Sequence, residues 1–231
     1  QSNCFESNAF VCSALVEMYG KWGNIKEAEK VFNMIDSPDL ILWNTMLSTY
    51  ELQGNVEKAL QIYGTMLGKG VVDYTSITCV LNACRRSGNL GGCRKNHFTI
   101  LSLGYDLDLV LMTTLIYAYG DCSSMLEAQE VFVRLLNANT SCWNALLCGY
   151  AKEGNYLVCF RHFEKMVVKS GIKPDKITFA ALLSVCNHAG LLDESMQILD
   201  SMRRVYGLAP DLEHYTCVVD VLGRAGDFTK V

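Results

Sequence analysis

The stretch WNALLCGYAKEGN at residues 143–155 decides the fold, because residues 43–55 read almost alike as WNTMLSTYELQGN. A second recurrence places Pro174-Asp175 36 residues before Pro210-Asp211. Self-similarity at such a period predicts a solenoid of stacked units rather than a globule around one core. Slots that hold the same kind of residue in every unit are therefore expected to be scaffold, and polar slots whose chemistry varies are expected to carry function.

Aligning the similar stretches gives a register of repeated units. The predicted boundaries are 1–8 for a partial unit, then 9–39, 40–73, 74–108, 109–139, 140–175 and 176–211, and 212–231 for a truncated one. Each full unit reads as two helices joined by a turn. The sequence therefore predicts an all-α fold, an α-solenoid superhelix of stacked helix-turn-helix units in a single array. Because the chain begins without Met and stops inside a unit, we expect a fragment or a processed form.

The helical slots repeat at helical spacing. The first helix carries an apolar pair such as Met46-Leu47, followed by an aromatic or apolar residue such as Tyr50. A glycine then ends this helix in every unit but one, where Ser123 stands instead. The second helix pairs a small residue such as Ala59 with a larger one four residues on, which lets neighbouring helices approach closely. These rows are expected to form the core, with Trp43 and Trp143 packed beside them.

Composition narrows the classes of function. The formal net charge of −4 gives no general basic signature, so contact with nucleic acid would need a local stripe of Lys and Arg. No apolar run approaches the roughly 20 residues that span a bilayer, and no membrane partner is expected. The 11 cysteines include no Cys-x-x-Cys pair, which disfavours zinc and thioredoxin-like sites. We expect reduced, buried thiols in a reducing compartment.

Two slots are polar in unit after unit. The fifth place of the first helix holds Ser13, Asn44, Thr78, Thr113, Asn144, Ala180 and Thr216. The last place of the unit holds Asp39, Asp73, Asp108, Asn139, Asp175 and Asp211. Capping of the next helix explains the last-place row. It leaves the fifth-place row unexplained, because Ser, Thr and Asn are mildly unfavourable inside a helix.

At these residues the chain resembles the pentatricopeptide repeat (PPR) family over its whole length. VCSALVEMYGKWGNIKEAEKVF, LILWNTMLSTYELQGNVEKALQIYGTM and IKPDKITFAALLSVCNHAGLLDESMQIL are similar to the short, standard and long repeats of the plant PLS subclass. LEHYTCVVDVLGRAG resembles the final short repeat that precedes the C-terminal extension of organellar RNA-editing factors. The departures from the family pattern are Ala180, Ser123 and the missing extension.

The resemblance implies that the fifth and last residues of each repeat face one RNA base. A last-place Asp accepts and so favours U or G, whereas Asn can donate and favours A or C. In the family, Asn in the fifth place selects a pyrimidine and Thr or Ser a purine. The implied site, read from unit 9–39 to unit 140–175, is 5′-G-U-G-A-U-3′, with the base at Ala180 undetermined.

The resemblance implies two further rows. The second residue of each repeat packs beside the base, and the apolar ones are Phe10, Ile41, Val110 and Ile177. Glu213 is a poor fit at that place. The thirteenth place forms a basic stripe toward phosphates, at Lys21, Arg86, Lys152, His188 and Arg224, interrupted by Leu52 and Asp121. The alternative is a solvated helix end with cations near its C-terminus.

No catalytic or cofactor motif appears. His162-Phe163-Glu164 matches the H-x-E part of zinc deaminases, but the P-C-x-x-C partner is missing. We therefore expect no enzyme, no cofactor and no bound metal. The expected function is sequence-specific binding of single-stranded RNA in a chloroplast or mitochondrion, specifying C-to-U editing, with a deaminase or other editing proteins as partners. The alternatives are a splicing, stability or translation factor, and a protein-interaction scaffold like tetratricopeptide repeats. The scaffold is disfavoured because those repeats keep 34 residues and Gly at the eighth place.

Overall fold

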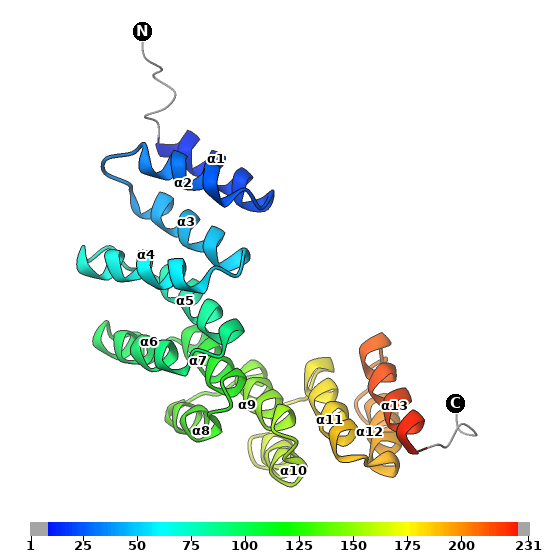
Figure 1. The fold of residues 1–231 in the computed structure, drawn as a ribbon. Helices are drawn as coiled ribbons and strands as arrows, with labels where there is room; N and C mark the ends of the chain where they lie inside the picture. The colour runs from blue at the N-terminus through cyan, green and yellow to red at the C-terminus, as the bar shows by residue number, and fades with distance from the viewer. Residues whose placement is uncertain (1–8, 226–231) are drawn as a thin grey trace. The chain divides into compact units, whose positions relative to one another are not determined.

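The computed structural model describes residues 9–225, and within this range the chain is entirely helical. Thirteen α-helices and one π-helical turn follow one another, with no strand between residues 9 and 225 (Figure 1). The predicted all-α helical solenoid is confirmed. The chain divides into two compact units, residues 1–106 and 107–231, and each is described by itself.

The first unit contains three helical hairpins. Its helices are α1 (Ala9–Lys21), α2 (Ile25–Asn33), α3 (Leu40–Leu52), α4 (Val56–Gly68), α5 (Tyr74–Ser87) and α6 (Leu90–Ser102). The first helices of successive hairpins contact each other, and each also packs on its own partner. Met46, Leu47, Val80 and Leu81 from the predicted apolar pairs are fully buried between them. The core therefore runs from hairpin to hairpin, as a stack of repeats requires.

The second unit follows the same plan. Its helices are α7 (Leu109–Asp121), α8 (Met125–Arg134), α9 (Thr140–Lys152), α10 (Tyr156–Glu164), α11 (Lys176–Ala189), α12 (Leu192–Arg204) and α13 (Leu212–Ala225). A π-helical turn, Lys165–Lys169, extends α10. Leu115, Ile116, Leu146 and Leu147 are fully buried. A hydrogen bond from Ile172 N to Met166 O then closes this wider end of the helix before α11.

The turns have glycine where the sequence predicted the first helices to end. Gly88 ends α5 and Gly190 ends α11 with left-handed backbone, at φ of 65° and 68°. Ser123, the sequence exception, takes the same conformation at φ 55°, the one described residue other than glycine that does so. Left-handed backbone costs a residue with a Cβ about 1 kcal/mol or more. The turn after α7 therefore keeps the shape of the others at some cost.

The two tryptophans that were predicted for the core, Trp43 and Trp143, pack as predicted, and they pack alike. Trp43 meets Phe32 edge to face with ring centroids 5.0 Å apart, and Trp143 meets Phe132 with centroids 4.6 Å apart. Both tryptophans are buried. Because 100 residues separate each residue from its counterpart, one arrangement of the core is built in each unit.

The cysteines are part of this packing. The ten cysteines of the described range are thiols that form no disulfide, and six of them are buried. Burial raises the pKa of the Cys159 thiol to about 12, so it stays protonated and unreactive at neutral pH. The structure therefore uses these thiols as small core residues.

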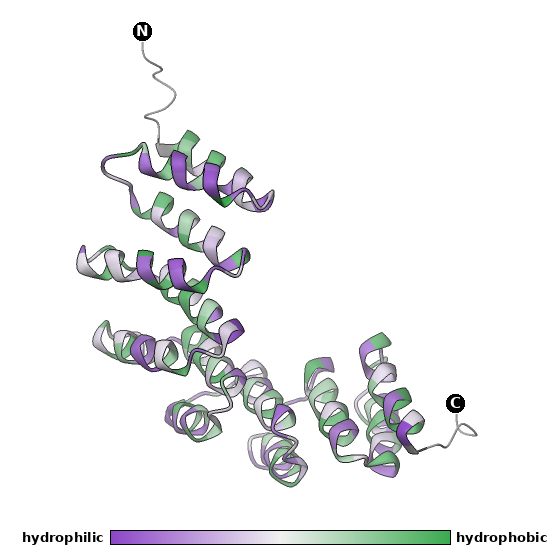
Figure 2. Ribbon diagram, viewed as in Figure 1, coloured by the Kyte–Doolittle hydropathy of each residue, from purple (hydrophilic) through white to green (hydrophobic). Residues whose placement is uncertain are grey.

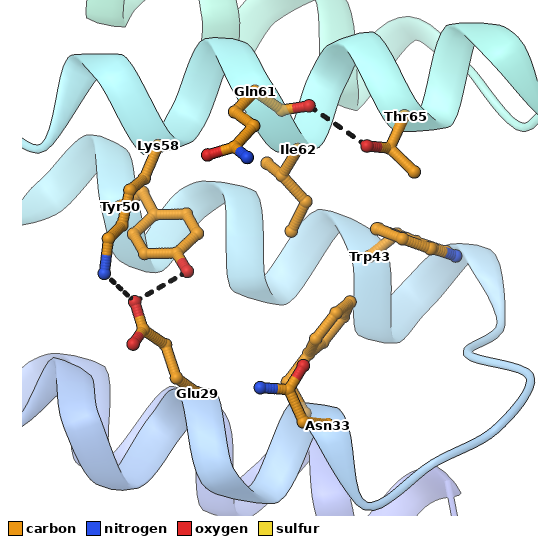
Figure 3. Close-up of a pocket in the computed structure, with 9 residues that line it drawn as sticks. Glu29, Asn33, Trp43, Tyr50, Lys58, Gln61, Ile62 and Thr65 are labelled. Atoms are coloured by element: carbon orange, nitrogen blue, oxygen red, sulfur yellow. Dashed lines mark hydrogen bonds and ion pairs between the residues drawn. The ribbon is translucent and has the colours of Figure 1, made fainter.

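Polar contacts also tie helices of the first unit together. The Tyr50 hydroxyl of α3 donates to Glu29 Oε1 of α2 at 2.9 Å, and the Lys58 ammonium of α4 pairs with the same carboxylate (Figure 3). Lys58 and Tyr50 together hold the pKa of Glu29 below its usual value, against the effect of burial. In the second unit Tyr150 donates instead to the neutral Gln129, at 2.7 Å.

Hydrophobic and hydrophilic residues interleave along the helices of both units, as Figure 2 shows, because each helix has a buried and an exposed side.

Among residues 9–225, none of the helices has both the length and the apolar character to cross a bilayer.

Candidate nucleic-acid interface

The last-place residues all stand where a helix begins. Five of them cap the next first helix through a side-chain oxygen that accepts a backbone N–H, as Asp39 Oδ1 accepts from Leu42 N at 2.8 Å. The residues that do so are Asp39, Asp73, Asp108, Asn139 and Asp175. Capping occupies one oxygen of each group, which leaves the rest of the side chain available for a second contact.

Two fifth-place residues reach their last-place partner directly. Asn44 Nδ2 donates to both carboxylate oxygens of Asp73, at 3.1 and 3.2 Å. Asn144 Nδ2 donates to Asp175 Oδ1 at 2.9 Å. The partners lie 29 and 31 residues apart in the sequence, so the stacking of hairpins brings each pair together.

The fifth-place Thr residues turn back on their own helix. Each hydroxyl donates to the carbonyl four residues earlier: Thr78 to Tyr74, Thr113 to Leu109 and Thr216 to Leu212. The Ser13 hydroxyl is buried and has no hydrogen-bond partner, so it does not reach Asp39. Of the predicted pairs whose members lie within one unit, only those led by Asn are hydrogen-bonded to each other. Thr78 and Asp108 lie in different units.

Several predicted rows meet at one hollow of about 460 Å³ in the first unit. It is lined by the Asn44–Asp73 pair, by the second-place residues Ile41 and Thr75, and by Lys21 from the thirteenth place. Asn44 Oδ1 is buried beside it without a hydrogen-bond partner. The hollow thus combines a carboxylate acceptor, an apolar wall and a cation at its margin.

The apolar second-place residues are exposed. Phe10 is 81% exposed, Ile41 67%, Val110 59% and Ile177 54%. Side chains in this position can cover the face of a planar group without repacking the fold.

The thirteenth-place cations are largely paired with acids. Lys21 binds Glu17 at 2.7 Å, Arg86 pairs with Glu51, and Lys152 pairs with Asp121. Arg224 donates to the carbonyl of Asn187 at 3.2 Å. The row that we predicted as a basic stripe is therefore a line of mixed charge. The i,i+4 spacing of Glu17 and Lys21 could have revealed one of these pairs, whereas the other two acids lie on the preceding hairpin.

The Asn144–Asp175 pair is more deeply buried at its Asn than the Asn44–Asp73 pair. Asn144 is only 1% exposed, and its Oδ1 accepts from the Thr178 hydroxyl at 2.6 Å. Thr178 was not among the predicted site residues. Its signal in the sequence is the capping box, in which a Ser or Thr follows the N-cap by three residues.

Unit 176–211 has no hydrogen bond between its fifth-place and last-place residues. Ala180 supplies no polar group, and Asp211 contacts His214 Nδ1 at 2.5 Å and Lys176 Nζ at 3.6 Å. The hydrogen bond with His214 is the main cause that lowers the pKa of Asp211.

The residues of the H-x-E match form no metal site. The ring of buried His162 lies against Tyr150, with centroids 4.9 Å apart, and its Nδ1 lies 2.9 Å from Val158 O. Burial lowers the pKa of His162. Within residues 9–225, no group of three metal-ligating side chains comes together.

Comparison with known families places the chain clearly. A model described as the PPR repeat matches residues 10–37, 41–71, 110–139 and 177–205, and a PPR repeat family model matches residues 138–188. A pentatricopeptide repeat-containing protein of Arabidopsis thaliana is 36% identical over 96% of this chain and 27% of its own length. Another from Arabidopsis thaliana, named chloroplastic, is 32% identical over 94% of this chain and 27% of its own length. The chain spans about a quarter to a third of the length of such relatives.

Solved structures show the same fold. The crystal structure of the pentatricopeptide repeat protein PPR10 from maize matches with a TM-score of 0.76 at 24% identity, over 96% of this chain and 32% of PPR10. A crystal structure of PPR10 in complex with an 18-nucleotide psaJ RNA element matches with a TM-score of 0.73 at 25% identity, over 96% of this chain and 33% of that one.

Proposed function

This chain belongs to the pentatricopeptide repeat family, and on that basis we propose that it binds single-stranded RNA, reading one base with each repeat. The observation that carries the proposal is the hollow at Asn44 and Asp73. There a carboxylate acceptor, an exposed Ile41 and Lys21 line one hollow, which supports contacts to a base edge, a base face and a phosphate. The likeness to PPR10, which was solved with an RNA element, supports the same proposal.

The bases follow from donor and acceptor chemistry. A last-place carboxylate accepts only, so Asp73 and Asp175 favour bases with a ring N–H, namely U or G. The fifth-place Asn beside each selects the pyrimidine, which leaves U at both places. The last-place Asn139 can donate and, with Thr113, selects A. The proposed site remains 5′-G-U-G-A-U-3′ along units 9–39 to 140–175, in which Ser13 with Asp39 and Thr78 with Asp108 read G.

The test is binding to RNA oligonucleotides that differ by one base. Replacing the U opposite the Asn144 repeat by A is expected to weaken binding about tenfold, as the loss of one well-made polar contact would. Fluorescence anisotropy measures it. Equal affinity for U and A at that place would overturn the assignment. Asn44→Ser is the matched variant, because it should move the preference at the first U toward G and leave the second U unchanged.

We propose C-to-U RNA editing as the process in which this RNA binding acts. The resemblance of the PLS-type repeats to organellar editing factors favours specification of a C-to-U editing site, with deamination by another domain or a partner protein. The chloroplastic name of one relative supports an organellar location for this chain. Splicing, stability and translation of organellar RNA are the competing roles. Transcript sequencing after loss of the gene separates them, since editing predicts an unconverted C just downstream of the bound site.

A further inference from the structure

The third residue of a repeat contacts both members of the preceding pair in the second unit. Thr178, the third residue of unit 176–211, donates to Asn144 Oδ1 at 2.6 Å and lies 3.0 Å from Asp175 Oδ1. A hydroxyl has one proton, and the shorter distance directs it to Asn144. Thr178 and Asn144 are almost completely buried, so water does not compete for this bond.

The same arrangement recurs one repeat earlier with different chemistry. Cys142, the third residue of unit 140–175, has its Sγ 3.1 Å from Thr113 Oγ1 and 3.2 Å from Asn139 Oδ1. Thr113 and Asn139 are the fifth-place and last-place residues of their repeat and make no direct hydrogen bond. Cys142 is therefore the link between two residues that would otherwise not be joined.

The first unit provides the contrast. Ser76 stands at the corresponding place and forms the same capping box, with its hydroxyl 2.8 Å from Asp73 O and 3.1 Å from Asp73 Oδ1. It makes no hydrogen bond to Asn44, and Asn44 Oδ1 remains without a partner. Capping of the helix is therefore separable from contact with the fifth-place residue.

From this we infer that Thr178 and Cys142, the third residues of their repeats, are positioning residues for base selection, so that the Asn144–Asp175 and Thr113–Asn139 reading groups are triads rather than pairs. The inference rests on the proposed RNA binding. An Asn amide has a donor end and an acceptor end of similar shape, and a half-turn exchanges them. Thr178 holds the acceptor end and Asp175 the donor end, which fixes Asn144 in one orientation. Asn44 is held at its donor end alone.

The consequence is a difference in strictness between the two proposed U positions. The Asn144 repeat should reject a wrong base more strongly than the Asn44 repeat, although both carry the same fifth-place and last-place residues. Fixing the polar group before binding removes the freedom to adapt to another base, which is how a preorganised site gains specificity.

The experiment measures the ratio of Kd values for RNA with C and with U at a given position, for the whole chain. Thr178→Val removes the hydroxyl and keeps the branched shape, and should lower the ratio at the Asn144 position about three- to tenfold, the worth of one hydrogen bond. Thr178→Ser restores the hydroxyl and should keep the ratio within about twofold of wild type. Circular dichroism and urea unfolding establish that each variant is folded.

Ser76→Ala is the matched control, because it removes a capping hydroxyl that does not touch Asn44. Its ratio at the Asn44 position should stay unchanged. An unchanged ratio in folded Thr178→Val overturns the inference, and so does an equal drop in Ser76→Ala, since capping would then account for both. A wild-type chain that does not distinguish U from A and C at the Asn144 position overturns the proposed function itself, before any variant is compared.

Discussion

The Asn44–Asp73 pair of the first unit and the Asn144–Asp175 pair of the second share residue types and helix position, yet their surroundings differ. Asn44 is half-buried at the edge of a hollow and has an unpartnered carbonyl oxygen. Asn144 is fully buried, with both ends of its amide hydrogen-bonded. Identical residues in a repeat therefore do not make identical sites. The neighbours in the next repeat decide how firmly the group is held.

The same contrast extends through the two units. Their aromatic packing is alike, with Trp43 on Phe32 and Trp143 on Phe132. The polar links differ: Glu29 is charged and paired with Lys58, whereas its counterpart Gln129 is neutral and faces a repeat that has Val158 in place of the lysine. The core is thus repeated while its polar contacts vary, and variants can be chosen to test each difference in turn.

The largest expected effect is on stability at the last-place residues. Asp175→Ala removes a helix cap and leaves the buried Asn144 amide without its acceptor, and should cost about 2–4 kcal/mol. Asp73→Ala removes a cap beside a more exposed amide and should cost about 1–2 kcal/mol. Urea unfolding without RNA measures both. Equal losses would show that burial of Asn144 adds nothing to the role of the cap.

A smaller effect concerns the contact between first helices. A Cβ at Gly20 would lie 2.6 Å from Thr49 Oγ1 and 2.8 Å from Thr49 Cγ2, whereas in the second unit glycine, Gly149, stands in place of Thr49. Gly20→Ala should therefore destabilise by about 1–3 kcal/mol through overpacking. Adding Thr49→Ala should recover most of that loss. Failure of the double variant to recover stability would place the strain elsewhere than at Thr49.

The charge pairs should affect RNA binding more than stability. Glu51→Gln releases Arg86 in the first unit, and Asp121→Asn releases Lys152 in the second. Each released cation should raise RNA affinity about two- to fivefold at low salt and steepen the slope of log K against log salt by about 0.7. Affinity measured from low to moderate salt tests this. A slope that stays unchanged would remove the thirteenth place from the phosphate contacts.

The smallest expected effect is a pH dependence confined to the first unit. Because Lys58 lowers the folded-state pKa of Glu29, the stability from this pair is present above the unfolded pKa of about 4.3 and is lost as pH falls through the lower folded pKa. Glu29→Gln should therefore cost less than about 1 kcal/mol at pH 7, and nothing once Glu29 is protonated in both states. Urea midpoints at pH 7 and at a pH below the lowered folded pKa of Glu29 measure the difference. Gln129→Glu is the control, since no lysine faces it at Val158, and it should gain no stability at pH 7.

Much of the architecture could be predicted from the sequence because it depends on local periodicity. The apolar pairs, the glycine turns and the left-handed Ser123 follow from spacing along one helix. The helix caps follow from Asp or Asn before an apolar run. The π-helical turn after α10 was not predicted, because nothing in the spacing of the residues distinguishes Lys165–Lys169 from an ordinary helix end.

The site was predictable as a set of rows and less so as a set of contacts. The sequence brings Asn44 toward Asp73 through the register alone. It does not reveal that Arg86 faces Glu51, or that Thr178 reaches Asn144, because each contact joins residues more than 30 positions apart on different hairpins. Charge counted along one row therefore overestimated the free positive charge, since the partners stood on another row.

Because the last-place residues cap α3, α5, α7, α9 and α11, any change of the proposed RNA specificity at this place must also keep the helix start. Any residue installed there for its choice of base must also start a helix, and only Ser, Thr, Asp, Asn and Gly do that well. The residue types that can stand at the last place are therefore those that both discriminate hydrogen-bond donors from acceptors and cap a helix. Asp and Asn, the two that occur, lie within that overlap. A substitution chosen only for its base preference would remove a helix cap and destabilise the repeat.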